Sequence, residues 1–130
     1  MIETSHLSPT AADLDRLHRC FVPEDLARRA GIFRVDGADG AELVGRKPTQ
    51  SRDYGGLVIP YHWPGELRVR EYRLRRDHPD LELQPDGGVR QTGKYLSPPG
   101  RGSLAYFPPD TFPEDLEEVS VPAVITEGEI

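Results

Sequence analysis

The chain has 130 residues, and its 22 acidic residues outnumber its 16 lysines and arginines, giving a formal net charge of −6. Its 13 glycines, 13 prolines and apolar fraction of 36% predict one small domain with a modest core, short strands and many turns. No run of about 18 apolar residues is present to span a membrane, no signal-peptide pattern opens the sequence, and the lone Cys20 supports neither an internal disulfide nor a zinc cluster, so we expect a cytoplasmic protein.

The first predicted element is a short amphipathic helix. Ser8 is its expected N-cap and Pro9 suits its first position. Leu14, Leu17 and Phe21 recur at helical spacing and form the expected buried stripe. We expect Cys20, beside this stripe, to be a core thiol rather than a nucleophile.

A second short helix is predicted over 23–30, closed by a left-handed Gly31, and an extended segment follows over 32–35. The helical hairpin is compatible with DNA reading by a helix-turn-helix. Two short amphipathic helices more often pack on a neighbour, and acidic residues beside the arginines of the second helix suit groove reading poorly. We therefore favour packing. Residues 36–53 are interpreted as a loop with one helical turn over 41–44.

The strongest β-strand pattern is a hairpin that begins at Gly56. An apolar run over 57–63 leads into the turn dipeptide Pro64–Gly65, and residues 66–76 are expected to return as the second strand. Pro60 lacks an N–H group, so it requires a sheet edge or a bulge.

The returning strand is rich in arginine. Its apolar residues change parity, which predicts a β-bulge near Arg70 that brings the arginines to one polar face. Like charges on one face repel unless an anion or carboxylates lie nearby, so the face predicts phosphate binding. The alternative is a solvated face whose arginines pair with the acidic C-terminal region. The predicted nucleic-acid or phosphate-binding set is Arg68, Arg70, Arg73, Arg75 and Arg76, with Lys94 and Tyr95 of the next short strand.

Shorter elements complete the chain. A polar loop is expected over 77–93, followed by two short aromatic strands over 94–97 and 104–107. A short acidic helix is expected near Pro113. The apolar run 123–126 is typical of a parallel strand buried on both faces.

Four motifs occur in a fixed order, Gly56–Tyr61, Tyr72–Pro79, Lys94–Gly100 and Ile125–Glu129. Together they resemble an uncharacterised domain that precedes and runs into the Toprim fold in primase-like proteins of phages, plasmids and integrated mobile elements. The resemblance implies that Glu127 is the catalytic acidic residue of metal-dependent phosphoryl transfer.

The same resemblance implies a metal site at Glu127 and Glu129, since Mg²⁺ is held by one or two carboxylates plus substrate phosphates. It also requires a downstream Asp-x-Asp pair, which this chain lacks. The Toprim site is then incomplete, and Mg²⁺ is expected only when the missing part is supplied. The alternative is a polar C-terminus without a role.

The sequence therefore predicts an α+β fold, with an N-terminal helical hairpin packed on a small, mostly antiparallel sheet and a final strand that begins a truncated Toprim-like domain. The expected regions are 1–53, 54–120 and 121–130. The function implied is that of the N-terminal portion of a primase-like protein that binds single-stranded nucleic acid or nucleotides and is not an enzyme on its own. The alternatives are a non-catalytic module that binds replication proteins, or a degenerate remnant.

Overall fold

The structure is a computed structural model that describes residues 6–47, 52–100, 102 and 104–126. Within these residues an antiparallel sheet has the strand order β1-β2-β3-β6, and β4 and β5 form a separate ribbon. The strands are β1 (Phe33–Val35), β2 (Gly56–Tyr61), β3 (Glu71–Arg76), β4 (Asp80–Leu83), β5 (Val89–Thr92) and β6 (Tyr95–Leu96). The helices are α1 (Ala11–Arg19), α2 (Glu24–Arg29), α3 (Gly37–Leu43) and α4 (Pro113–Glu117). The predicted α+β fold is confirmed.

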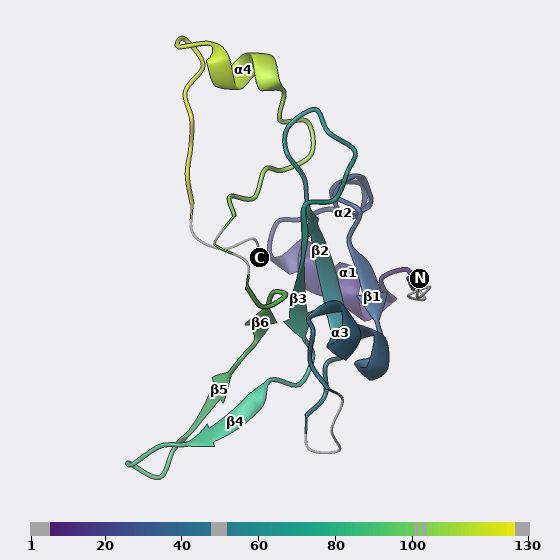
Figure 1. Cartoon of the computed structure of the whole chain (residues 1–130), viewed down its shortest axis with the longest axis vertical. Coiled ribbons are helices and arrows are strands. Elements are labelled where there is room, and N and C mark those ends of the chain that lie inside the picture. The colour runs from purple at the N-terminus through teal and green to yellow at the C-terminus, as the bar shows by residue number, and fades with distance from the viewer. Residues whose placement is uncertain (1–5, 48–51, 101, 103, 127–130) are drawn as a thin grey trace.

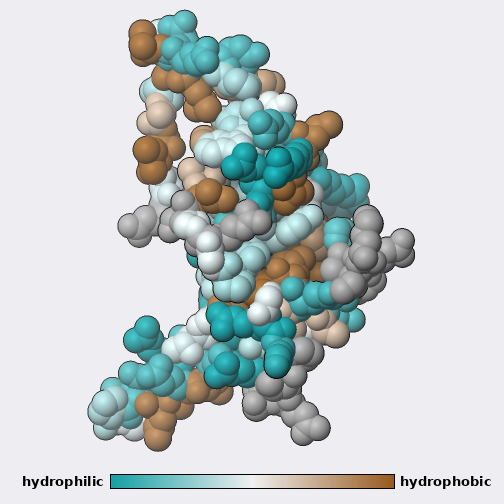
Figure 2. Space-filling view, in the orientation of Figure 1, coloured by the Kyte–Doolittle hydropathy of each residue, from teal (hydrophilic) through white to brown (hydrophobic). Residues whose placement is uncertain are grey.

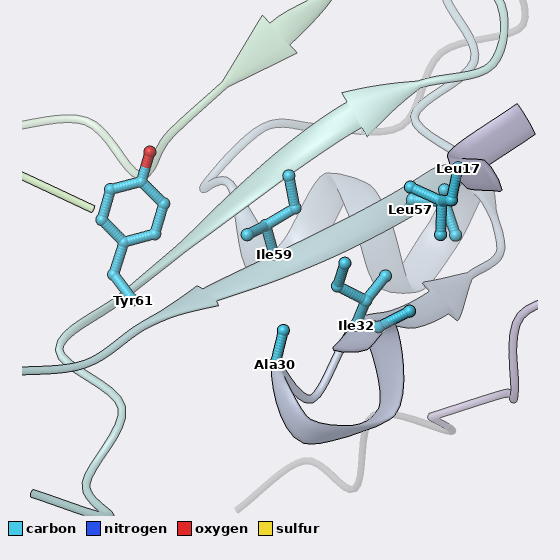
Figure 3. Packing of buried hydrophobic residues seen from close by; sticks show 7 residues of the cluster. Leu17, Ala30, Ile32, Leu57, Ile59 and Tyr61 are labelled. Atoms are coloured by element: carbon cyan, nitrogen blue, oxygen red, sulfur yellow. The ribbon is translucent and has the colours of Figure 1, made fainter. Parts of the chain in front are cut away.

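Helices cover both faces of the four-stranded sheet, with α3 in front and α1 behind in Figure 1. Successive side chains of a strand point to opposite faces, so β2 contributes to two clusters. Leu57, Ile59 and Tyr61 pack with residues of α1 and α2 (Figure 3), whereas Val58 packs with residues of α3, β1 and β3. Because β1 pairs with β2, the predicted regions 1–53 and 54–120 share one sheet.

The N-cap of α1 is Thr10, not the predicted Ser8. The Thr10 hydroxyl accepts from the Asp13 N–H at 3.2 Å, and the Asp13 carboxylate accepts from the Thr10 N–H at 2.9 Å. This reciprocal pair is a capping box. It places Asp13 on the buried side of the helix beside Leu17. Only 2% of the surface of Asp13 is exposed.

Two residues predicted to lie in the core lie on the surface. Phe21 is 93% exposed, because its φ of 64° turns the chain away from the sheet after α1 ends. Cys20 is exposed as well. The second helix does end at a left-handed Gly31, with φ 73°, as predicted. The helical turn predicted over 41–44 is the end of the longer α3, whose first turn is capped by Asp36.

The predicted hairpin is confirmed in its pairing but not in its length. β2 and β3 pair along their whole lengths in one unbroken register. Residues 62–70 form the connecting loop, where Leu67 is 97% exposed. The bulge predicted near Arg70 is therefore wrong, because the apolar residues before it are not part of the strand. Pro60 lies beyond Val58, the last residue of β2 that pairs with β1, which agrees with the predicted edge position.

Several C-terminal predictions are corrected. The expected polar loop over 77–93 contains the β4–β5 ribbon, which projects at the lower left of Figure 1. Residues 104–107 form no strand, although Leu104 and Tyr106 pack against the cluster beneath α1 and α2. Residues 121–126 form no strand either, and Val124 and Ile125 there are 86% and 94% exposed.

In the part of the chain described, no helix has both the length and the apolar character needed to cross a membrane.

An ion network joins α1, β1 and the end of β3. The Arg34 guanidinium donates to both oxygens of Asp13, at 2.7 and 2.5 Å, and to both oxygens of Asp77, at 2.5 and 3.1 Å. Burial by itself raises the pKa of Asp13, but hydrogen bonds from Arg34 and Thr10 outweigh it and lower the pKa from 3.8 to about 2. The Asp13 and Asp77 carboxylates raise the pKa of Arg34. The charged network is thus the stable form of this site.

The lowered pKa of Asp13 predicts acid sensitivity. A carboxyl group whose pKa is depressed on folding stabilises the fold above its unfolded pKa, and this contribution is lost as the pH falls through its folded pKa. The contribution of Asp13 is about 2 kcal/mol, lost as the pH falls from 3.8 toward about 2. We expect Asp13→Asn to lower the free energy of unfolding at neutral pH by about 3 kcal/mol and to flatten its decline in this acid range.

Urea unfolding followed by circular dichroism at a series of pH values measures both effects. The matched control is Asp15→Asn, which neutralises an exposed carboxylate on the same helix and is expected to change the stability by less than about 0.5 kcal/mol. Equal effects of the two substitutions would contradict the assigned role of Asp13.

Candidate nucleic-acid interface

The predicted arginine set does not share one strand face. Only Arg73, Arg75 and Arg76 lie in β3, and Arg68 and Arg70 lie in the loop before it. Within β3, Arg73 and Arg75 pair with Ile59 and Leu57 of β2, whose side chains point toward α1 and α2. Arg76 has the opposite parity, so it points to the other face.

Arg76 is a buried structural residue. It is 1% exposed, and its guanidinium donates to the Asp53 carbonyl at 2.8 Å, the Gly93 carbonyl at 3.2 Å and the Asp80 carboxylate at 2.9 Å. It also lies over the Tyr54 ring, 4.7 Å from the centroid. With its donors engaged inside the protein, Arg76 does not belong to a surface that contacts phosphate.

Arg73, Arg75, Lys94 and Tyr95 do come together. Tyr95 pairs with Arg75 in the register of β3 and β6. The Arg73 guanidinium lies 5.4 Å, and the Lys94 ammonium 5.7 Å, from the centroid of the Tyr95 ring. Both distances lie within the range of cation–π attraction. We call these four residues the Tyr95 surface.

The charge at the Tyr95 surface is positive. Neither Arg75 nor Lys94 forms an ion pair with any residue that the structure describes. The nearby Asp80 is engaged by Arg76, whose hydrogen bond lowers the pKa of that carboxyl group. Glu71, on the same side of β3, is buried, and its Oε1 has no hydrogen-bond partner within the described part of the chain. Arg75 and Lys94 are therefore the cations of this surface that no described carboxylate neutralises.

A second arginine–aromatic pair lies at the other end of β3. The Arg70 guanidinium is 5.2 Å from the centroid of the Trp63 ring, and Trp63 lies 5.6 Å from Phe107, centroid to centroid. Sequence reasoning included Arg70 but missed Trp63. The available signal was an aromatic residue immediately before the Pro64–Gly65 turn, where burial in a strand is not expected. Arg68 in the same loop is exposed, and its carbonyl lies 3.1 Å from the His62 Nδ1.

The residues to which the resemblance assigns catalysis and Mg²⁺ are Glu127 and Glu129, and both lie outside the described residues. Over 6–47, 52–100, 102 and 104–126, no group of three or more His, Cys, Asp or Glu side chains could hold a metal ion.

Comparison of the chain with protein-family models, with curated proteins and with solved structures gives no match. The functional assignment therefore depends on the residues themselves.

Because Arg75 and Arg76 point to opposite faces of β3, the same substitution is predicted to change the stability much more at Arg76 than at Arg75. Arg76→Met removes the buried hydrogen bonds and leaves Asp80 without its main partner, so we expect the free energy of unfolding to fall by about 3 to 5 kcal/mol. Arg75→Met changes a partly exposed strand residue, and we expect a change within about 1 kcal/mol. Urea unfolding of both variants makes the comparison, and equal losses would argue against the structural role of Arg76.

Proposed function

We propose that this chain is a binding module for single-stranded nucleic acid, with the Tyr95 surface as its principal contact. The observation that carries the proposal is one aromatic ring with Arg73 and Lys94 within cation–π distance and Arg75 beside it. Proteins that bind single strands combine cations that follow the backbone with aromatic rings on which bases stack. A base stacked on Tyr95 would replace one cation over the ring, and that cation would then be free to bind the phosphate of the same nucleotide.

The overall charge supports a restricted interface. A chain with a net charge of −6 repels a polyanion over most of its surface, so binding must be confined to a local positive face. The exposed acidic helix α4 (Pro113–Glu117) adds to this repulsion. We therefore expect modest affinity that depends steeply on salt.

We further propose that this module is the N-terminal portion of a Toprim-type, primase-like protein, as the order of its four motifs suggests. In that setting the module would hold the strand, and Glu127 and Glu129 would contribute to metal-dependent phosphoryl transfer together with the other acidic residues of the Toprim fold.

A second candidate function is binding to a protein partner. The observation that favours it is the β4–β5 ribbon, whose Leu81, Leu83 and Val89 are 70%, 76% and 63% exposed. Figure 2 shows hydrophobic residues at the projecting end of this ribbon. Two-stranded ribbons are only marginally stable in water on their own, so a partner that covers these residues would stabilise the ribbon.

Fluorescence anisotropy with a labelled oligothymidylate at several salt concentrations tests the proposed function. We expect the logarithm of the affinity to fall linearly with the logarithm of the salt concentration, and Arg75→Gln to reduce the slope by about 0.7 for the lost phosphate contact. Tyr95→Leu is expected to weaken binding about tenfold, with little change for Tyr95→Phe, because phenylalanine retains the stacking ring.

Arg90→Gln is the matched control for charge. Arg90 is exposed on β5, so this substitution removes the same charge from the β4–β5 ribbon instead of from the Tyr95 surface. It is expected to leave the salt slope unchanged. No detectable binding by the wild-type chain at low salt would falsify the proposal, and equal effects of Arg75→Gln and Arg90→Gln would show that only net charge matters.

A further inference from the structure

A pocket of about 500 Å³ lies between the β2–β3 loop, the segment 106–112 and the end of α2. Figure 1 shows the loop next to the segment that leads to α4. The side chains that line the pocket are mainly aromatic residues and prolines. The aromatic residues are Trp63, Tyr106, Phe107 and Phe112.

The walls of the pocket are held by contacts on both sides. Tyr106 packs on Tyr61 of β2, with ring centroids 5.2 Å apart, and Phe107 packs on Trp63. An ion pair between Arg29 and Asp110 ties the segment 106–112 to α2. The aromatic rings are therefore positioned by the fold before any ligand binds, which lowers the entropy cost of binding.

One cation lies next to the largest ring of the pocket. The Arg70 guanidinium is 5.2 Å from the centroid of the Trp63 ring. Two carboxylates also line the pocket, Glu66 and Asp110, but Asp110 is neutralised by Arg29. A ligand with a planar apolar part is complementary to the aromatic lining, and a negative group attached to it would be attracted to Arg70 beside Trp63.

Building on the proposed function, we propose that this pocket holds a base of the bound single strand on Trp63, as a second stacking position. β3 connects the two positions, because Arg75 pairs with Tyr95 at one end and Arg70 lies over Trp63 at the other. The five residue steps from Arg70 to Arg75 span about 17 Å of extended chain. One strand a few nucleotides long would contact both rings, with Arg70, Arg73 and Arg75 beside its phosphates.

Aromatic residues and prolines also line grooves that bind proline-rich peptides. Two observations favour a nucleic acid strand instead. Arg70 lies over Trp63, where a phosphate needs a cation and a polyproline segment does not. The pocket is also linked through β3 to the Tyr95 surface, whereas a peptide would use the pocket alone.

Trp63 provides a direct test, because it is the only tryptophan of the chain. Its fluorescence is expected to be quenched when an oligothymidylate of about twelve nucleotides is added at low salt. Oligomers of about two nucleotides are too short to contact both rings, so we expect them to bind at least tenfold more weakly. The full chain is used without a label.

Trp63→Leu keeps an apolar side chain but removes the stacking ring, and is expected to weaken anisotropy-measured binding of the long oligomer about tenfold. The matched control is Leu81→Ala on β4, which changes an exposed apolar residue outside the pocket and should bind as the wild type does. If Trp63→Leu does not fold, the wild-type fluorescence and photo-crosslinking of a 5-iodouracil oligomer, mapped by mass spectrometry, still report whether a base reaches Trp63.

The outcomes separate the two proposals. Quenching together with loss of affinity in Trp63→Leu supports the second stacking position. Salt-dependent binding that requires Arg75 but leaves Trp63 fluorescence unchanged overturns the pocket assignment and retains the proposed function. The absence of any binding overturns both. A change in Trp63 fluorescence with a proline-rich peptide, and none with the oligomer, assigns the pocket to a peptide instead.

Discussion

The hydrogen-bonded network of Asp13, Arg34 and Asp77 holds the N-terminal helices in register with the sheet. Arg34 lies in β1, and its two carboxylate partners come from α1 and from the residue that follows β3. Separating two charged partners of such a network is strongly destabilising, so displacing α1 from the sheet would separate Asp13 from Arg34 and leave Arg34 with Asp77 alone. The apolar cluster beneath α1 and α2 would tolerate several positions of these helices on the sheet, because apolar contacts have no preferred direction. The hydrogen bonds of Arg34 are directional and favour one of these positions.

Arg76 has a comparable role on the opposite side. It binds backbone carbonyls before β2 and before β6, together with Asp80 at the start of the ribbon. Arg34, which is partly buried, and Arg76, which is buried, therefore engage Asp13, Asp77 and Asp80. These carboxylates do not pair with Arg75 or Lys94 of the Tyr95 surface, although the chain as a whole is acidic. The fold and the proposed function are thus linked through the same set of charges.

The proposed function uses two arginine–aromatic pairs, Arg73 with Tyr95 and Arg70 with Trp63. Cation–π contacts hold long, flexible arginine side chains close to the rings and lower the entropy that is lost on binding. Stacking is tolerant of base identity, because every base offers an aromatic face. The arrangement therefore fits a module that holds a strand, rather than one that reads a sequence.

Local patterns in the sequence determined the elements whose cause is local: α2 with its glycine end, the pairing of the β2–β3 hairpin and the short acidic α4. They could not determine which of two neighbouring arginines is buried, because that depends on where β3 begins. Arg68 and Arg70 lie in the loop before β3 and not in the strand. The apolar residues whose parity predicted a bulge therefore do not all belong to one strand. Trp63 and Phe107 are 44 positions apart, and only the packing of their loops brings them together. Side-chain register and contacts between distant segments arise from tertiary packing, which short-range periodicity does not encode.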